Sequence, residues 1–371
     1  MSFLLSVFYF FYFAIVGVYI IFIPKVLAMS GYSGVEIGVI FAASPLVRFF
    51  LPFAFMKGFE LNAKVFNIAL FVMLGSAFSF YLSLEHFYKL LLSNIGLGIG
   101  LGLILPYVEF VALKEIGKEN YGKVRLFGSV GFVLVALVLV KFLSSSQVAL
   151  NFLLFLTFCT AFISFFVAKK ANIHTREREE ECSSKENIFQ DYKLWIGLTL
   201  MQVSFGSFYN FFTIYETAHG ISLDMTIYLW SFGVLCEIVM LYFQGGFLQQ
   251  NLLNILKLTT LISSLRWGLL FVFPENLPLL FFSQSLHAFS FALFHTAAIS
   301  YLHKIYKNKT LAQQLFSGLT YGLGGLLGAL FAGYIYEYFQ TYLFLSSALL
   351  ALISSGFLEL WSRDKASKKR L

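Results

Sequence analysis

The chain has 371 residues, of which 59% are apolar and only 12% are charged, and its mean hydropathy is +0.80. Soluble domains carry about 25% charged residues, so this composition excludes an ordinary soluble globular protein and indicates a membrane protein with many spans. The net charge of +7 is interpreted as a signal of membrane orientation and does not indicate nucleic-acid binding.

Twelve apolar segments follow one another along the chain. Each is long enough to cross about 30 Å of hydrocarbon as a helix. In chain order they cover residues 3–23, 35–56, 65–84, 86–113, 126–143, 148–168, 194–215, 226–247, 252–273, 277–302, 312–338 and 341–361. The first has no basic flank or small-residue cleavage site, so we expect a retained helix and not a signal peptide. The sequence therefore predicts an all-α membrane protein with twelve transmembrane helices.

A hydrophilic stretch at residues 169–193 divides the spans into two sets of six. We expect an N-terminal six-helix bundle at 1–168, a cytoplasmic linker loop at 169–193, a C-terminal six-helix bundle at 194–361 and a cytoplasmic basic tail at 362–371. The halves also resemble each other, because the LFGS sequence that opens span five has a counterpart, LFSG, 189 residues later at the start of span eleven. Parallel six-span repeats related by a pseudo-two-fold axis are typical of secondary transporters, which handle substrate at the repeat interface.

The distribution of lysine and arginine predicts the orientation. With the N-terminus inside, 21 of the 26 basic residues lie in cytoplasmic connections and only Lys25, Lys89 and Lys141 lie outside. The remaining two, Arg48 and Arg266, fall within spans. Because basic residues accumulate on the cytoplasmic side, both termini are expected in the cytoplasm.

No catalytic or cofactor pattern is found in the sequence. Cys159 and Cys236 lie in spans and Cys182 in the linker, so no disulfide or metal-site spacing exists. A membrane-embedded enzyme would need a nucleophile with its base, a metal set or a carboxylate dyad, and a channel would not need two equivalent bundles. We therefore expect a monomeric transporter without a cofactor or metal, whose partners are the lipid bilayer, a small-molecule substrate and protons.

Glycines at helical spacing predict close helix contacts. Without a hydrophobic driving force between helices in lipid, small residues allow two backbones to approach each other. Gly128 and Gly131 in span five are assigned such a structural or gating role. Arg48 in span two is grouped with them, although a purely structural ion pair remains open for Arg48 and for Arg266.

Ionisable residues within spans are the sharper functional signal. A charge at the centre of a span costs about 2.5 to 3.5 kcal/mol on insertion scales, so it persists where it faces a cavity or a partner. Glu109 and Arg125 lie eight residues before and after Gly117. A hairpin that turns near Gly117 sets them at similar depth, where they could pair.

Polar side chains line one face of span seven and one face of span ten. On span seven the stripe comprises Gln202, Gly206, Tyr209, Thr213 and Glu216. On span ten Gln284, His287 and His295 share an arc, with the two histidines about 12 Å apart in height. We expect these faces to line a cavity.

Four motifs, YGKVRLFGSVGF (121–132), YLWSFGVLCEI (228–238), LRWG (265–268) and SLHAFSFALFHTAAISYL (285–302), carry a resemblance. Together they resemble the phenylpropionate permease group of the major facilitator superfamily, bacterial inner-membrane relatives of the lactose and nucleoside proton symporters. The resemblance implies substrate-binding roles for Arg125 and, with a two-residue spacing difference, for Glu109. It implies proton-coupling roles for Arg266 and His287. With the polar faces, the predicted substrate-binding set is Glu109, Arg125, Gln202, Tyr209, Gln284 and His295.

One departure from the lactose-permease pattern concerns the proton carrier. In the lactose permease a carboxylate lies three residues after the histidine that matches His287, and here that position is Ser290. The lactose permease also has a lysine three residues before that histidine, and here that position is Gln284. A carboxylate elsewhere must then carry the proton. Glu237 on span eight is the first choice and Glu109 the second.

The substrate class that suits these residues is an aromatic carboxylate, because a guanidinium binds a carboxylate bidentately and aromatic side chains offer ring contacts. The 47 phenylalanines and 20 tyrosines are spread over every span, however, and are compatible with lipid-facing bulk. Uptake of a sugar, a nucleoside or another small acid, and drug efflux, remain the alternatives.

Overall fold

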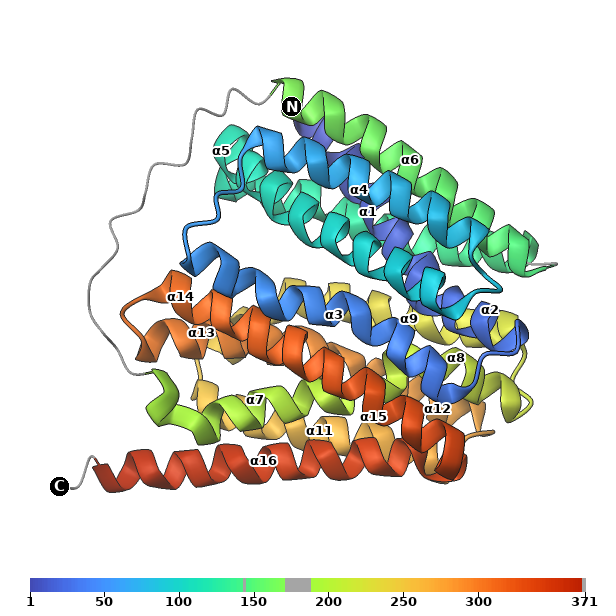
Figure 1. The fold of residues 1–371 in the computed structure, drawn as a ribbon. Coiled ribbons are helices and arrows are strands. Elements are labelled where there is room, and N and C mark those ends of the chain that lie inside the picture. The colour runs from blue at the N-terminus through green and yellow to red at the C-terminus, as the bar shows by residue number, and fades with distance from the viewer. Residues whose placement is uncertain (143–144, 171–187, 369–371) are drawn as a thin grey trace. The chain divides into compact units, whose positions relative to one another are not determined.

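The computed structural model describes residues 1–142, 145–170 and 188–368, and every regular element in these residues is a helix (Figure 1). Most of the predicted 169–193 linker, including Cys182, lies outside the described residues, as do residues 369–371 of the predicted tail. The rest of that tail belongs to the last helix, which continues to Lys368.

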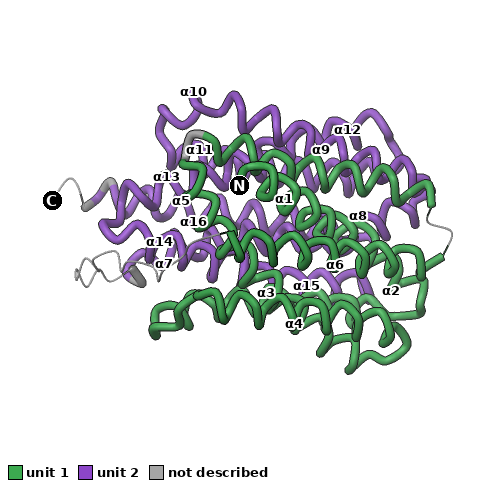
Figure 2. Tube along the Cα trace, turned by 90° about the horizontal axis from the view of Figure 1, so that it is seen from above, with its two compact units in different colours: residues 1–179 green, residues 180–371 purple. Residues whose placement is uncertain are grey.

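The chain forms two compact units, Met1–Glu179 and Glu180–Leu371, which Figure 2 shows in different colours. The helices of the first unit are Ser2–Gly17 (α1), a π-helical segment Val18–Phe22, Ile23–Met29 (α2), Gly34–Met56 (α3), Ala63–Leu82 (α4), Phe87–Phe142 (α5) and Ser146–Lys170 (α6). Residues 2–29 form one span, and α5 is divided at Gly117, so this unit contains six spans.

Local sequence signals set several of these helix boundaries. Ser33 and Glu36 form a reciprocal capping box that begins α3, and the Asn62 side chain accepts two backbone N–H groups at the start of α4. Gly117 has φ of 73°, a conformation that glycine adopts without strain. The chain reverses there, because Tyr121 contacts Glu109 at 3.2 Å, whereas a straight helix would separate them by about 18 Å.

The second unit begins with a 3₁₀ turn at Ile188–Asp191. Its helices are Tyr192–Ser204 (α7), Gly206–Ala218 (α8), Leu223–Phe243 (α9), Gly245–Leu248 (α10), Leu252–Val272 (α11), Leu277–Ser285 (α12), Phe294–Ile305 (α13), Lys309–Leu315 (α14), Gly324–Phe339 (α15) and Leu343–Lys368 (α16). Two π-helical segments, Ala288–Leu293 and Phe316–Leu323, and a 3₁₀ turn, Gln340–Tyr342, connect some of them.

Ten helical runs in the described residues are long and apolar enough to cross a membrane. Three predicted spans of the second unit account for the difference from twelve. The seventh consists of α7 and α8, interrupted at Phe205. The eleventh and twelfth lie in one run, residues 309–365, on either side of the Gln340–Tyr342 turn. Each of the twelve predicted spans therefore corresponds to helix.

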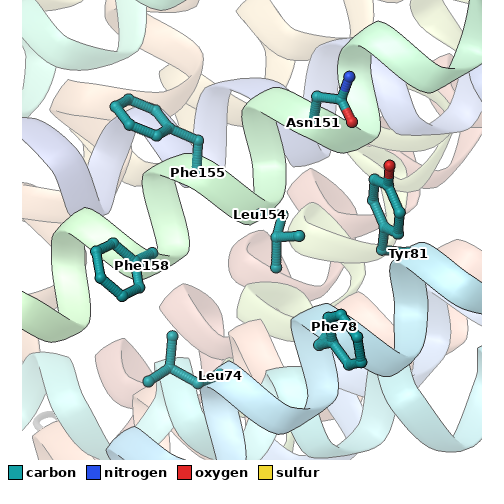
Figure 3. A pocket seen from close by; sticks show the side chains of 7 residues that line it. All are labelled: Leu74, Phe78, Tyr81, Asn151, Leu154, Phe155 and Phe158. Atoms are coloured by element: carbon teal, nitrogen blue, oxygen red, sulfur yellow. The ribbon is translucent and has the colours of Figure 1, made fainter.

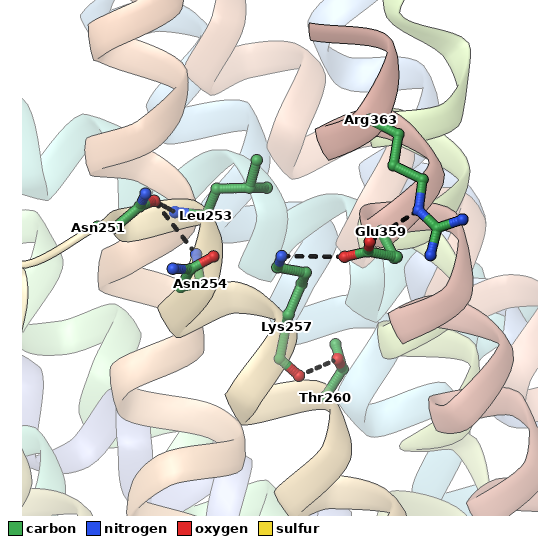
Figure 4. A network of polar contacts seen from close by, with 7 residues as sticks. All are labelled: Asn251, Leu253, Asn254, Lys257, Thr260, Glu359 and Arg363. Carbon is green, nitrogen blue, oxygen red and sulfur yellow. Dashed lines mark hydrogen bonds and ion pairs between the residues drawn. The ribbon is translucent and has the colours of Figure 1, made fainter. Parts of the chain in front are cut away.

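Ion pairs and hydrogen bonds join the helix ends of the second unit. Lys257 on α11 contacts Glu359 on α16 at 3.0 Å, and Glu359 also accepts from Arg363 at 2.9 Å (Figure 4). The Tyr306 hydroxyl, in the loop after α13, donates to Asp191 at 2.6 Å. Burial, reinforced by Asp191, raises the pKa of Tyr306, so this hydroxyl remains a donor.

Close contact between α1 and α5 depends on glycine. A Cβ atom at Gly131 would overlap the carbonyl group of Phe10 on α1. Gly206 on α8 has the same relation to the Gly328 backbone on α15. These contacts agree with the expectation that small residues let helix backbones approach each other in lipid.

Gly131→Ala is expected to destabilise the protein by about 1 to 3 kcal/mol, because the added methyl group must push α1 away from α5. Gly75→Ala is the matched control, since no atom lies within 4 Å of its added Cβ. Thermal unfolding of the purified variants measures the difference. Equal melting temperatures for the two variants would show that the α1–α5 contact is not tight.

Candidate functional site

A buried hydrogen-bond network surrounds Arg266 in the second unit. Arg266 on α11 is 0% exposed. Its Nη1 donates to Nδ1 of His287 at 2.9 Å and to Oγ of Ser290 at 3.3 Å, and its Nη2 donates to Oε1 of Gln284 at 2.9 Å. The three partners follow one another at three-residue spacing: Gln284 on α12, His287 just after it, and Ser290 in the π-helical segment that follows. One guanidinium group therefore binds three successive positions on one face of span ten.

The arginine determines the tautomer of His287. A guanidinium group only donates hydrogen bonds, so Nδ1 of His287 must accept, and the ring proton of a neutral imidazole lies on Nε2. Nε2 in turn lies 3.5 Å from Oε2 of Glu237 on α9. The side chain of His287 is 6% exposed and that of Glu237 is 20% exposed. The three predicted proton-coupling residues are thus connected in the order Arg266, His287, Glu237, and the carboxylate is the most accessible.

Aromatic rings shield the guanidinium group. Its Cζ lies 4.3 Å from the ring centroid of Phe208 and 4.4 Å from that of Trp267. The helix break at Phe205 brings a third ring to within 5.8 Å. A desolvated cation gains from such ring contacts, and the rings exclude water from the network.

Ring stacking connects His295 to this network. The His287 and Phe291 rings stack at 5.2 Å with an interplanar angle of 4°, and Phe291 is 6.4 Å from His295. Nδ1 of His295 contacts the hydroxyl of Tyr321 at 2.6 Å. The two histidines therefore share a face as predicted, with an aromatic ring between them.

The predicted polar residues of span seven contact different parts of the second unit. The Tyr209 ring lies 6.5 Å from Phe291, beside the histidine stack. Gln202 is buried and packs near Gly324 on the other side of the helix break. Thr213 accepts a hydrogen bond from the Trp230 indole at 3.1 Å. The stripe therefore serves several contacts and does not form one continuous polar wall.

A second polar cluster lies in the first unit, around Glu109. Oε1 of Glu109 accepts from the Tyr121 hydroxyl at 3.2 Å. Arg125 and Arg48 both interact electrostatically with Glu109, and Arg48 is exposed. In the described part of the chain no ion pair within 4.0 Å joins Glu109 to Arg125. The turn at Gly117 brings the two residues together, with Tyr121 as the direct partner of the carboxylate.

Arg125 lies against aromatic rings. Its Cζ is 3.8 Å from the Phe13 ring centroid and 5.5 Å from that of Tyr9, both on α1. A Cβ atom at Gly128 would lie 2.7 Å from the Phe13 ring and 2.8 Å from Nη1 of Arg125. Gly128 thus leaves the space in which the guanidinium group and the ring meet.

Sequence reasoning missed the aromatic partners of both clusters. Phe13, Tyr9 and Phe208 occur among so many aromatic residues that none stands out. Tyr121 had a usable signal, because it precedes Arg125 by four residues and therefore shares its helix face.

In the described residues no group of three or more histidine, cysteine, aspartate or glutamate side chains is arranged to hold a metal ion.

An apolar groove on the first unit differs in chemistry from these clusters. It has a volume of about 510 Å³ and lies between α4 and α6 (Figure 3). Its lining includes the exposed rings of Phe78, Phe155 and Phe158. Only Tyr81 and Asn151 add polar atoms, so the groove has the character of a lipid-covered surface.

Twelve spans in two units, with charged clusters buried among the helices, define a multi-pass membrane transporter of the secondary type. The chain belongs to the MFS_1 like family, whose model matches residues 3–346. It is therefore a transporter of the major facilitator superfamily.

Three known proteins illustrate the relationship. The chain is 25% identical over 357 residues to the "Probable 3-phenylpropionic acid transporter" of Escherichia coli (strain K12), covering 93% of each chain. Its fold matches the crystal structure of the nucleoside transporter NupG with a TM-score of 0.81 at 15% identity, covering 97% of this chain and 98% of that one. It matches a D-xylose-proton symporter with a TM-score of 0.68 at 12% identity, covering 96% of each.

Gln284→Leu is expected to cost about 1 to 3 kcal/mol of stability, because it leaves a buried donor of Arg266 without an acceptor. Ser285→Ala is the control, since Ser285 is only half-buried and its hydroxyl donates to the backbone of its own helix. Melting temperatures of the purified variants test the expectation. A Gln284→Leu protein as stable as Ser285→Ala would mean that Gln284 does not support the arginine.

Proposed function

We propose that this protein takes up a small organic solute, such as an aromatic carboxylate, by proton-coupled alternating access. It would work in the bacterial inner membrane as a monomer, with both termini in the cytoplasm. The observation that carries the proton coupling is the series Arg266, His287 and Glu237 in the second unit, which runs from a buried arginine to a partly exposed carboxylate. The substrate class is supported by the guanidinium group and aromatic rings around Arg125.

Protonation of Glu237 changes the charge balance of the second-unit network. While Glu237 is ionised, it attracts the Nε2–H group of His287, which accepts from Arg266 through Nδ1. When Glu237 binds a proton, that attraction is lost and the network keeps the charge of Arg266 alone. A buried unpaired charge is costly, so proton binding favours a rearrangement that gives Arg266 another partner or access to water.

A carboxylate from another helix takes the place of the one that the lactose permease has at the position of Ser290. Where the lactose permease has a carboxylate on span ten, Ser290 here accepts a hydrogen bond from Arg266. The carboxylate near the histidine comes instead from α9, as Glu237. The family arrangement of arginine, histidine and carboxylate is thus kept with a different residue as the proposed proton carrier.

The first-unit cluster suits a substrate that has both a ring and an anionic group. Arg125 is held by ring contacts and forms no ion pair in the described residues, so its planar fork can bind a carboxylate bidentately. Phe13 and Tyr9 offer ring surface next to that fork. The name of the Escherichia coli relative, with its 3-phenylpropionic acid substrate, points to the same class.

Symport of a sugar or nucleoside is the second candidate. The hydrogen-bonded pair of Glu109 and Tyr121 supports it, because a carboxylate and a phenol can bind substrate hydroxyl groups. The matches to a nucleoside transporter and a xylose symporter agree with this alternative. Drug efflux is less well supported, and a membrane-embedded enzyme has no catalytic constellation among the candidate residues.

Uptake into proteoliposomes tests the proposed function. Counterflow with a panel of aromatic acids, sugars and nucleosides is expected to select the aromatic acids. An imposed inward proton gradient is then expected to accumulate that substrate, and a protonophore to abolish accumulation. Accumulation that ignores the protonophore and follows sodium would remove the proton from the mechanism.

Arg125→Lys is expected to weaken substrate binding by about 10- to 100-fold, because the ammonium keeps the charge but cannot make the bidentate contact, a difference of about 1.5 to 3 kcal/mol. Glu109→Gln is expected to weaken binding if the carboxylate contacts substrate or orients the site. Arg363→Lys is the control, since Arg363 is 74% exposed. Equilibrium binding to the purified variants gives the affinities. Wild-type affinity in both Arg125→Lys and Glu109→Gln would move the site to the region of His287 and Arg266.

A further inference from the structure

Glu216 is a buried carboxylate that the Arg266 network does not include. It lies near the end of α8, two residues before Ala218, and its exposed fraction is 0%. Neither Oε1 nor Oε2 has a hydrogen-bond partner. In this respect it differs from Glu109, Glu237 and Glu359, each of which contacts a donor.

These surroundings disfavour an ionised carboxylate. A charge taken out of water without a partner loses its solvation and gains nothing in return. The position adds to this cost, because the last turn of a helix carries the negative end of its dipole. The backbone carbonyl of Glu216 lies at that end, where it accepts the N–H groups of His219 and Ile221. The protonated, neutral acid is the form that this conformation accommodates.

Among the described residues, no cation forms an ion pair with Glu216. The helices packed against α8 are α15, α9, α16 and α7. Among their titratable side chains and those of α8, only Tyr215 interacts electrostatically with Glu216. On α15 Tyr336 interacts with Glu337. The charged residues of α7 and α16 have other partners. Lys193 pairs with Asp364, and Glu359 pairs with Lys257 and Arg363, while Lys365 contacts the hydroxyl and ring of Tyr301 on α13.

Glu216 is also separate from the proposed coupling network. It lies eight residues, or about 12 Å along the helix, beyond Phe208, whose ring covers Arg266. Thr213, on the same face one turn earlier, is occupied by its hydrogen bond with Trp230. Hence no chain of hydrogen bonds in the described residues connects Glu216 to His287.

We propose that Glu216 is a second protonation site of the transport cycle, neutral in the conformation described here and ionised when the end of α8 near the His219–Ser222 turn becomes hydrated. On hydration the carboxyl O–H bond breaks and the proton passes to water. On return the carboxylate takes a proton from water before it is buried. This inference rests on the proposed proton-coupled transport.

Infrared spectroscopy of the full chain in lipid nanodiscs tests the protonation directly. The wild type near neutral pH is expected to show a protonated carboxyl band that shifts in D₂O and is missing from Glu216→Gln. Glu275→Gln, which changes an exposed carboxylate in the loop before α12, is expected to retain the band. If Glu216→Gln does not fold, Glu216→Asp is used, and the band is expected to shift in frequency. A band unchanged by substitution of Glu216 would overturn the proposal.

Transport by the same variants separates this inference from the proposed function. Glu216→Gln is expected to retain counterflow within about twofold, since the amide imitates the neutral acid, and to lose accumulation driven by a proton gradient. Wild-type accumulation that needs no proton gradient would overturn the proposed function and the role of Glu216 in the cycle, while the infrared band still reports its protonation. Glu216→Gln with wild-type proton-driven accumulation would overturn the inference alone.

Discussion

The desolvated guanidinium group of Arg266 constrains the second unit more than any other single group. A fully buried cation needs acceptors and polarisable surroundings, and here it takes both from several helices. His287, Gln284 and Ser290 supply the acceptors from span ten, and Phe208 and Trp267 supply the rings. Because α11, span ten and α8 all contribute, the charge of one residue links the positions of three spans.

Helix irregularities make these contacts possible. The interruption at Phe205 turns α7 into α8 and brings a ring toward Arg266, and the π-helical segment at Ala288–Leu293 begins directly after His287. In the first unit the reversal at Gly117 brings Glu109 within reach of Tyr121. π-helical turns often occur at functional sites, where they re-aim side chains. In this protein the break at Phe205, the π-helical segment at Ala288–Leu293 and the turn at Gly117 lie next to the charged clusters.

The two units have different chemistry around their arginines. Arg266 is enclosed and makes three hydrogen bonds to His287, Ser290 and Gln284, whereas Arg125 is held by rings and forms no ion pair within the described residues. The enclosed arginine suits a network that responds to a proton on Glu237, and the ring-held arginine suits an anionic solute. Glu216 adds a carboxylate whose burial, without any partner, makes its charge state depend on hydration.

The sequence by itself determined the membrane class and the twelve spans, because hydrocarbon thickness and the cost of charge in lipid act on residue type and spacing alone. The resemblance of four sequence motifs indicated the family. That resemblance also implied proton-coupling roles for Arg266 and His287, and the serine at position 290 led to Glu237 as the proposed carrier. Only the tertiary structure decided which atoms meet. Folding brings the Tyr121 hydroxyl to Glu109 and places the Phe13 ring against Arg125. It also leaves the Glu216 carboxylate without a hydrogen-bond partner among the described residues. Aromatic residues are too common in this chain for composition to distinguish those that touch a charge from those that face lipid.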